Sequence, residues 1–363
     1  MARKETIVGR KYRLVSVLAI AGIALAACGE APDDDEGDGA SGDYLACMVT
    51  DIGGIDDRSF NESAWAGLQN AAAASDQLAD PVNVSSGAEA DYLPNLTGYV
   101  EQDCDFILAV GGLMATATAE VAAANPDQQF GIVDGKLPDN PNVYPMQFDT
   151  AQAAFLAGYL AAGYSESGVV ATYGGEQIDS VTIFMDGFAD GVAHYNETND
   201  ADVELLGWDK EAQEGSFTDD FEEQALGRAL SDSFVAQGAD VIMPVAGGAG
   251  LGTAAAPGAG EDYVVIWVDV DGCESAEQYC STFLTTVVKN MPDAVQQAVL
   301  ESAGSDGLAT GEVLGTLENE GVSLAPYHEF EDAISEELKT DIIDLQADII
   351  DGTITVTSPA QPS

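Results

Sequence analysis

Positively charged side chains are scarce in this sequence. Its 363 residues contain 11 lysines and arginines against 63 aspartates and glutamates, a formal net charge of −52. Five of the eleven cations lie within the first 13 residues, so residues 28–363 carry six cations, 62 acids and a net charge of −56. Nucleic acids and anionic membranes are bound through patches of Lys and Arg, which also clamp phosphorylated ligands. The composition therefore excludes a nucleic-acid-binding or anionic-membrane-binding surface and argues against a phosphorylated ligand.

Several catalytic and cofactor-binding motifs are also missing. No GxGxxG opens a helix, and Gly247–Gly252 (GGAGLG) does not have that spacing. No GxxxxGK[ST] phosphate loop and no GxSxG nucleophile turn occurs, and the two histidines, His194 and His328, have no ligand-like or catalytic spacing. The sequence therefore predicts no nucleotide cofactor, no metal site and no enzyme.

The remaining composition is that of a folded protein. Hydrophobic residues make up 46% of the chain, well above the range of disordered proteins, and the length allows two domains. An acidic surface with so few lysines is typical of a protein that works in high salt, where screening weakens self-repulsion. An acidic protein from a low-salt source is the alternative interpretation.

The N-terminus has the pattern of an export signal. Basic residues at 10–13 precede the apolar stretch 14–27, which is too short to span a bilayer but suits a signal peptide. Leu25-Ala26-Ala27-Cys28 resembles a lipobox, which predicts a lipoprotein signal peptide at 1–27 and a lipid-modified Cys28; an ordinary signal peptide is the alternative. Residues 28–43 are acidic and lack apolar periodicity, so we expect a solvated tether to the outer face of the cell membrane.

The other four cysteines are expected to form disulfides. An even number of cysteines outside the cytoplasm favours pairing. Cys273 and Cys280 bracket a short polar loop and are expected to pair, while Cys47 lies in the first predicted strand and Cys104 just before another, which suits a bridge between them. Metal ligation is the alternative, although the chain contains no CxxC.

From residue 44 the sequence alternates between short apolar strands and alanine-rich helices. Continuous apolar strands in repeated βα units indicate parallel sheets covered on both faces, and about three hundred residues of this pattern favour two doubly wound α/β domains. The predicted strands span 44–50, 106–110, 130–134, 142–148, 168–173, 203–208, 240–244 and 263–270, and the predicted helices span 64–74, 115–124, 151–164, 181–195 and 221–237.

Glycines and aspartates follow most of these strands. In doubly wound sheets, ligands bind beyond the carboxyl ends of the strands, where glycine lets the backbone approach a ligand and aspartate can accept hydrogen bonds. A tight βα turn is the alternative explanation for any single pair of glycines. The strand ends read Thr50-Asp51-Ile52-Gly53-Gly54, Gly111-Gly112-Leu113-Met114, Asp134-Gly135, Tyr173-Gly174-Gly175, Ala246-Gly247-Gly248 and Asp269-Val270-Asp271.

The most specific stretch is 49–67, VTDIGGIDDRSFNESAWAG, which closely resembles the signature of the basic membrane protein lipoproteins, the purine nucleoside receptor-like binding proteins of ABC transporters. Further similar segments follow in the order expected for that family, and the resemblance covers residues 44–355. These segments are 130–134 (FGIVD), 154–158 (AFLAG), 187–192 (GFADGV), 215–219 (GSFTD), 238–242 (GADVI), 268–271 (VDVD), and Thr285, Thr286 and Lys289-Asn290.

The resemblance implies a type I periplasmic-binding-protein fold with two Rossmann-like lobes, joined by three hinge strands, and a ligand in the cleft. We expect the first lobe at 44–148 plus 271–318 and the second at 149–270 plus 319–355. The implied function is a monomeric, lipid-anchored binding protein without a cofactor, which delivers a nucleoside, most simply a purine nucleoside, to an ABC permease and its ATPase.

The resemblance also implies roles for individual residues. Phe60 and Phe217 would sandwich the base, and Asn61 and Asp134 would hydrogen-bond to its edge, with Asp51 and Ser59 beside them. Asp269 would accept both ribose hydroxyls, helped by Lys289 and the backbone of Gly247 and Gly248. Stacking and charge-assisted hydrogen bonds make these roles physically sensible.

Each role has a structural alternative. Phe60 and Phe217 could be packing residues, Asn61 or Ser59 could cap the following helix, Asp134 and Asp269 could be turn residues, and Lys289 could be a surface cation. Another small ligand, such as a sugar-like signal or a flavin, a role as a surface sensor, or a nucleoside-processing activity are the alternative functions.

Overall fold

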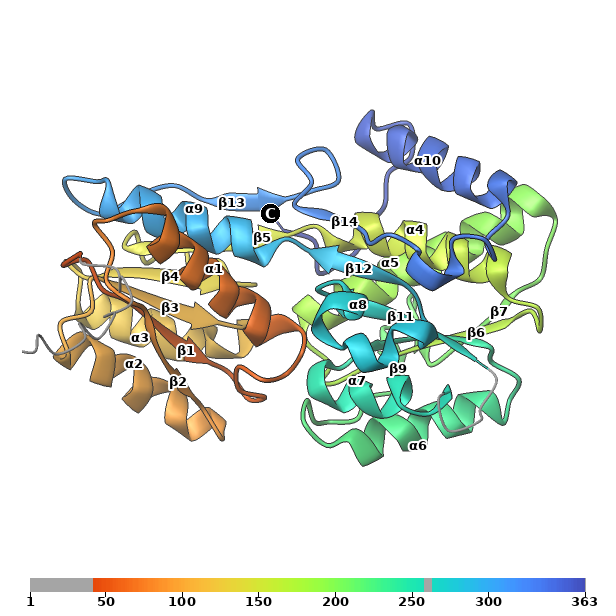
Figure 1. Cartoon of the computed structure of the whole chain (residues 1–363), viewed down its shortest axis with the longest axis horizontal. Helices are drawn as coiled ribbons and strands as arrows, with labels where there is room; N and C mark the ends of the chain where they lie inside the picture. Colours follow the sequence, from red (N-terminus) through yellow and green to blue (C-terminus); the bar gives the residue numbers. More distant parts are fainter. Residues whose placement is uncertain (1–41, 258–262, 363) are drawn as a thin grey trace, which may run out of the picture. The chain divides into compact units, whose positions relative to one another are not determined.

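A computed structural model of the chain describes residues 42–257 and 263–362. The signal peptide, Cys28 and all but the last two residues of the predicted tether lie outside the described residues. The described chain forms two six-stranded sheets, each covered by helices on both faces, which confirms the predicted α/β fold with two parallel-sheet lobes (Figure 1).

The first sheet is parallel throughout, with helices α1 and α9 packed on one face and α2 and α3 on the other. Its strands, in spatial order, are β2 (Val82–Ser85), β1 (Ala46–Thr50), β3 (Phe106–Val110), β4 (Gln129–Val133), β5 (Val143–Phe148) and β13 (Val313–Gly315). Its helices are α1 (Phe60–Ala74), α2 (Tyr92–Glu101), α3 (Ala115–Ala124) and α9 (Met291–Ala303), with short 3₁₀ turns at Glu89–Asp91 and Gly112–Met114.

The second sheet is parallel except for its last strand, β14, which runs antiparallel to β12. Its strands are β7 (Glu204–Leu206), β6 (Val169–Gly174), β10 (Val241–Val245), β11 (Val264–Asp269), β12 (Phe283–Lys289) and β14 (Val322–Leu324). Its helices are α4 (Thr150–Tyr164), α5 (Asp179–Asn199), α6 (Gln224–Val235), α7 (Gly247–Ala254), α8 (Gly272–Ser275) and α10 (Glu336–Ile350). A small hairpin, β8 (Trp208–Asp209) with β9 (Glu214–Gly215), and 3₁₀ turns at Glu277–Thr282 and His328–Phe330 complete this lobe.

The composition of the strands explains why both faces are covered. All five residues of β1 are buried, and they alternate between two hydrophobic clusters: Ala46 and Met48 face one, and Cys47 and Val49 face the other. A strand with no polar side must be covered on both faces, which is the arrangement of a doubly wound sheet.

Helices α4 and α5 pack unusually closely because glycines lie at their contact. A Cβ added to Gly158 would lie 2.1 Å from the carbonyl oxygen of Phe188, and one added to Gly191 would lie 2.0 Å from that of Phe155. Two segments that carried the family resemblance, 154–158 and 187–192, therefore serve packing within the second lobe.

The chain passes between the sheets three times, at 148–150, 289–291 and 315–322. The predicted lobe division placed residues 271–318 in the first lobe, whereas β12 pairs with β11 and β14 inside the second sheet. Five of the six residues from Phe283 to Val288 are buried, and β12 lies between β11 and β14, so the second crossing comes at Lys289 and not at residue 271.

Residues near the C-terminus are held against the first crossing. The Gln361 side-chain amide donates to both carboxylate oxygens of Asp149, at 3.1 and 3.2 Å, and the Ser358 hydroxyl donates to the buried Asp186 of α5 at 2.6 Å. These contacts tie residues 358–361 to both the crossing and the second lobe.

The disulfides form as predicted, between Cys47 and Cys104 and between Cys273 and Cys280. The first joins β1 to the turn before β3, and the second joins α8 to the 3₁₀ turn at Glu277–Thr282. Both pairings are confirmed.

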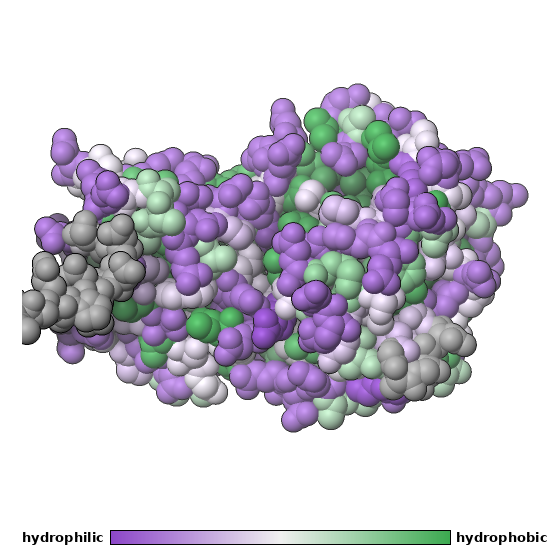
Figure 2. Space-filling view, in the orientation of Figure 1, coloured by the Kyte–Doolittle hydropathy of each residue, from purple (hydrophilic) through white to green (hydrophobic). Residues whose placement is uncertain are grey.

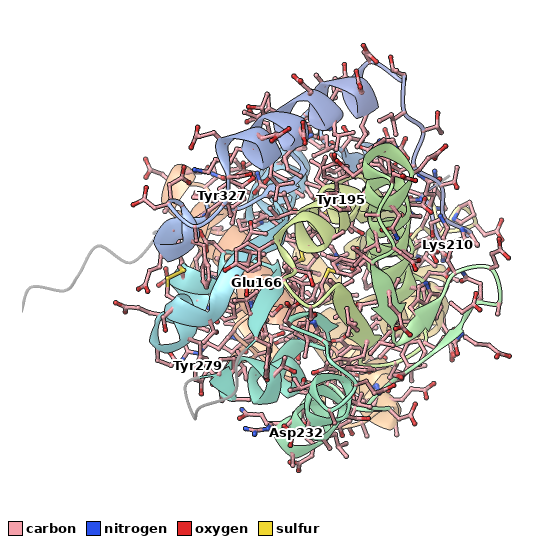
Figure 3. All side chains as sticks on the ribbon, turned by 90° about the vertical axis from the view of Figure 1, so that its right-hand side faces the viewer. Glu166, Tyr195, Lys210, Asp232, Tyr279 and Tyr327 are labelled. Atoms are coloured by element: carbon pink, nitrogen blue, oxygen red, sulfur yellow. A yellow bond between two sulfur atoms is a disulfide. The ribbon has the colours of Figure 1, made fainter. Side chains whose placement is uncertain are left out.

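The surface is strongly hydrophilic. Hydrophilic side chains cover most of the face shown in Figure 2, and carboxylate oxygens project from much of the surface in Figure 3. Lys210, labelled in Figure 3, forms an ion pair with Asp190 at 2.6 Å. Within the described residues, no helix combines the length and apolar character needed to cross a membrane.

Candidate ligand-binding site

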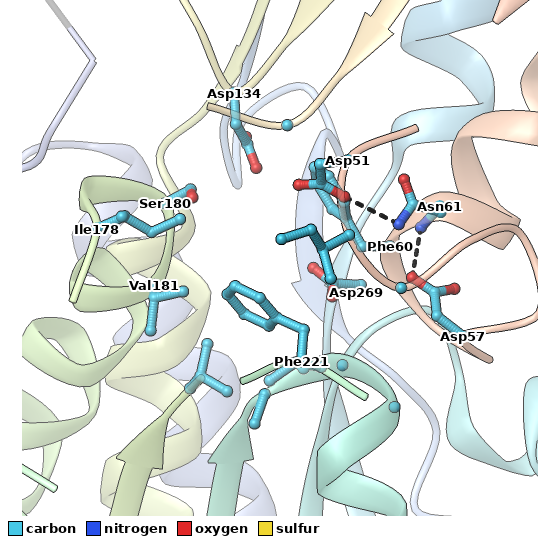
Figure 4. A pocket seen from close by; sticks show the side chains of 18 of the residues that line it. Asp51, Asp57, Phe60, Asn61, Asp134, Ile178, Ser180, Val181, Phe221 and Asp269 are labelled. Atoms are coloured by element: carbon cyan, nitrogen blue, oxygen red, sulfur yellow. Dashed lines mark hydrogen bonds between the residues drawn. The ribbon is translucent and has the colours of Figure 1, made fainter. Parts of the chain in front are cut away.

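A pocket lies where strand ends of both sheets meet (Figure 4). The space between its lining atoms is about 560 Å³, a figure that includes space open to solvent. Eight of the ten predicted ligand-binding residues line it; Ser59 and Phe217 do not. The eight are Asp51, Phe60, Asn61, Asp134, Gly247, Gly248, Asp269 and Lys289.

Asp51 follows β1 and is buried. The Asn61 side-chain amide donates to Asp51 Oδ1 at 3.1 Å, as the dashed line in Figure 4 shows. Burial raises the pKa of Asp51 well above its usual range, the bond from Asn61 opposes that rise, and the negative charges of Asp57 and Asp134 add to it. Asn61 thus supports a pocket carboxyl group and does not cap α1.

The carboxylate of Asp57 caps α1. It accepts hydrogen bonds from the backbone N–H groups of Ser59, Asn61 and Glu62 at 3.1, 2.8 and 3.1 Å. Burial raises the pKa of Asp57 to about 6, although these three bonds favour the charged form. Asp57 therefore fixes the first turn of α1, which carries Phe60 and Asn61 into the pocket.

Lys289, at the end of β12, is a buried cation: its side chain is 2% exposed. Its ammonium donates to Asp134 Oδ2 at 2.7 Å and lies 3.7 Å from Asp269 Oδ1. The ammonium also lies 5.0 Å from the ring centroid of Phe60. The alternative of a surface cation is thereby excluded.

Asp134 and Asp269 occupy equivalent places, directly after β4 and at the end of β11. Both have left-handed backbone conformations, with φ of 57° and 72°. Burial raises the pKa of Asp134, while the charge of Lys289 and its hydrogen bond lower it. Asp269 also accepts a 2.7 Å hydrogen bond from the Ser59 hydroxyl, so Ser59 contacts the site through Asp269.

Gly247 and Gly248 form the first turn of α7 and line the pocket with their backbone. Gly247 has φ of +49°, a conformation that glycine adopts without strain. The N–H groups of a first helical turn point out of the helix and can meet a ligand acceptor.

The pocket surface from α5, β10 and the loop before α6 is mainly apolar. Ile178 directly precedes α5, Val181 and Phe184 lie in its first two turns, and Phe221 comes from the loop before α6. Phe217 lies in the same loop, but its ring packs edge-on against Trp208, with centroids 6.0 Å apart. The structure therefore places Phe221, and not Phe217, in the pocket lining.

The pocket lining also includes four residues that were not predicted from the sequence: Asp57, Ile178, Val181 and Phe221. Asp57 is a capping candidate only for a helix that begins at Phe60, as α1 does, and the helix was predicted to begin at residue 64. Phe221 had only the signal of being a second phenylalanine four residues after Phe217. Ile178 and Val181 had none, because apolar residues at a helix start are expected for packing alone.

One group of side chains has metal-ligand character. Atoms of Asp271, Cys273 and His328 lie within 4.8 Å of one another, and His328 Nε2 is 2.7 Å from Asp271 Oδ2. The sulfur of Cys273 is bonded to Cys280, so it is not available as a thiolate ligand.

Known proteins are similar to this chain over nearly its whole length. A CD4+ T-cell-stimulating antigen of Listeria innocua is 30% identical, over 96% of this chain and 98% of its own. The ABC transporter nucleoside-binding protein BmpA of Lactococcus lactis is 29% identical, over 95% of this chain and 98% of its own.

A solved structure supports the fold. A solute-binding protein of an ABC transporter system from Aeropyrum pernix superposes with a TM-score of 0.78 at 23% identity, covering 88% of this chain and 94% of that one. The two lobes have the fold of type I periplasmic binding proteins. The sequence model of the PnrA-like ABC transporter substrate-binding proteins matches residues 45–359. The chain therefore belongs to this family of extracytoplasmic substrate-binding proteins, which serve ABC permeases and their ATPases.

Proposed function

We propose that this protein binds a nucleoside, most simply a purine nucleoside, and delivers it to an ABC importer. The observation that carries the proposal is the combination at one pocket of Phe60, a buried Lys289 and four carboxyl groups, three of them on buried residues. The aromatic ring provides a surface for a base, and the carboxyl groups provide acceptors for its N–H groups and for the ribose hydroxyls.

The charge balance of the pocket favours a neutral ligand. Lys289 is the single lysine or arginine among its lining residues within the described chain, and it already contacts Asp134 and Asp269. A phosphate group would meet the carboxylates without a free cation to pair with, whereas ribose hydroxyls can donate to Asp269.

The strand ends suggest how ligand and lobe closure are coupled. Two contacts already join the lobes at the pocket, Ser59 to Asp269 and Lys289 to Asp134. A nucleoside that contacts Asp134 and Asp269 together stabilises the closed state because it binds residues of both lobes.

The direct test is binding by the purified extracytoplasmic chain. Adenosine, guanosine and inosine are expected to raise the melting temperature and to give saturable heats by calorimetry, with one site per chain. Ribose, free bases, AMP and riboflavin are the comparison ligands. Stabilisation by one of these and by none of the nucleosides would refute the proposal, and mass spectrometry of co-purified ligand gives an independent answer.

The location of the protein is a second part of the proposal. Cys28 is proposed to carry lipid, with residues 28–43 as the tether and a monomeric binding domain beyond it. Cys28→Ser is expected to release the protein from the membrane fraction and to abolish incorporation of labelled palmitate. Retention of the variant in membranes would contradict lipid anchoring but would leave ligand binding untouched.

A further inference from the structure

We infer that Phe221, and not Phe217, is the aromatic residue through which the second lobe contacts the base. This inference rests on the proposed nucleoside-binding function. It assigns a specificity role to a residue that differs from the one that the family resemblance indicates.

The Phe217 ring packs against Gly174 and Trp208. Residue 217 forms a β-bridge with Gly174, and its ring lies where a Cβ on Gly174 would come within 2.6 Å of a ring carbon. The Phe217 ring also packs edge-on against Trp208, which is 6% exposed. The indole N–H of Trp208 donates a 2.9 Å hydrogen bond to Asp186. Removing the Phe217 ring would therefore disturb the β6 end and the β8 hairpin.

Phe221 lies in the pocket, as its labelled side chain in Figure 4 shows. Its ring lies against Gly175: a Cβ added there would come within 2.3 Å of a ring carbon. A side chain at position 175 would displace the ring, so Phe221 can occupy this position only because residue 175 is glycine.

The backbone around Phe221 is fixed from both sides. The carbonyl oxygen of Phe221 accepts a 2.9 Å hydrogen bond from the N–H of Ala249 in α7. Before it, the Thr218 hydroxyl donates to the Asp220 carbonyl at 2.6 Å, and after it the N–H groups of Glu222 and Glu223 donate to the Asp220 carboxylate. A ring on such a backbone is preorganised, which reduces the entropy lost when a ligand binds.

The neighbours of Phe221 match a planar ligand. Ile178 and Val181 continue an apolar surface beside the ring. The polar groups come from Asp51 and Asp134 of the other lobe and from Asp269 and Lys289 at the ends of β11 and β12. A base placed against Phe221 therefore turns its face to carbon and leaves its edge to the hydrogen-bonding groups.

The test compares matched phenylalanine-to-leucine substitutions with adenosine, guanosine and inosine as probes. Phe221→Leu is expected to weaken binding by roughly 5- to 140-fold, because a stacked aromatic contributes about 1–3 kcal/mol per base. Phe221→Tyr keeps the aromatic face and is expected to stay within about threefold of the wild type. Phe217→Leu is expected to lower the melting temperature while the folded protein keeps its affinity.

A second variant tests the contact between Gly175 and the Phe221 ring without altering either phenylalanine. Gly175→Ala is expected to weaken binding in parallel with Phe221→Leu, since it displaces the ring. Loss of affinity in Phe217→Leu with wild-type affinity in Phe221→Leu overturns the inference, and so does tighter binding by Phe221→Leu, which would show that the ring obstructs the pocket. Failure of the wild type to bind any of the three nucleosides refutes the proposed function instead.

Discussion

The two sides of the pocket use opposite chemistry. The side built by β1, β4 and α1 presents Asp51 and Asn61, which are buried, and Asp134, whose side chain is 7% exposed. The side built by α5 and the loop before α6 presents mostly carbon, from Ile178 and Phe221 among others. We call these the polar wall and the apolar wall.

The difference follows from how each wall is made. The polar wall lies at strand ends and at the first turn of a helix, where free backbone groups need partners and short acidic side chains supply them. The apolar wall lies along α5, whose buried residues continue directly into the core. A ligand with a flat apolar face and a polar edge fits such a pair of walls without leaving a buried polar group unpaired.

The largest expected effect concerns the cation that supports the polar wall. Lys289→Met would leave Asp134 and Asp269 buried without their counter-charge, and breaking a buried ion pair costs about 3–5 kcal/mol of unfolding free energy. Urea denaturation measures this directly. Lys339→Met, which removes a cation whose acidic partners are largely exposed, is the control and should cost less than about 1 kcal/mol. Equal costs for the two variants would show that the wall does not depend on Lys289.

The next effect is on binding through Asp269. Asp269→Asn keeps the size of the side chain and tolerates the left-handed backbone, but it loses the charge that strengthens hydrogen bonds to a diol. We expect the affinity for a nucleoside to fall about 100-fold, measured by calorimetry. Asp344→Asn, an exposed acid on α10, should bind as the wild type does. Unchanged affinity in Asp269→Asn would show that the ribose does not bind at Asp269.

The polar wall should also respond to pH, and the apolar wall should not. The pKa of Asp57 is raised to about 6 in the folded protein, above its ordinary value of 3.8. Between about pH 4 and pH 6 the folded state keeps a proton that the unfolded state has lost, so this contribution to stability declines as pH rises. It amounts to on the order of 2–3 kcal/mol. Urea unfolding of Asp57→Asn across this window should show a flatter profile than the wild type; an identical slope would contradict the assignment.

The smallest effect is expected from an aliphatic residue of the apolar wall. Ile178→Val removes one methylene from the pocket surface, which is worth about 0.8 kcal/mol if the ligand covers it completely. We expect nucleoside affinity to fall no more than about fourfold, without a change in the pH profile. A loss of affinity as large as that of Asp269→Asn would contradict the view that Ile178 contributes only apolar contact to nucleoside binding.

The fold was predictable because its signal is repeated. Alternating apolar strands and alanine-rich helices identified both lobes, and the carboxyl ends of the strands indicated the pocket. The boundary at β12 was not predictable in the same way, because Thr285 and Thr286 interrupt its apolar residues and no strand was predicted at 283–289. Only its pairing with β11 and β14 decides the matter.

The site was predictable where a residue is tied to a strand end. Asp51, Asp134 and Asp269 follow strands directly, so their positions depend on the sheet alone. Phe221 lies in an irregular loop, where the direction of a side chain depends on contacts such as the hydrogen bond between Phe221 and Ala249. A local pattern does not encode such contacts, and the choice between Phe217 and Phe221 could not be made from spacing.

The left-handed backbone at Asp134 and Asp269 also limits how this pocket can change over evolutionary time. At φ of 57° and 72°, asparagine and glycine fit with little strain, whereas β-branched residues pay a steric penalty at the same place. A new ligand preference that needs an apolar residue at either position must therefore first remodel the turn. Substitutions at Ile178 or Phe221 meet no such barrier, so new specificities should arise first on the side of the pocket that holds the base face.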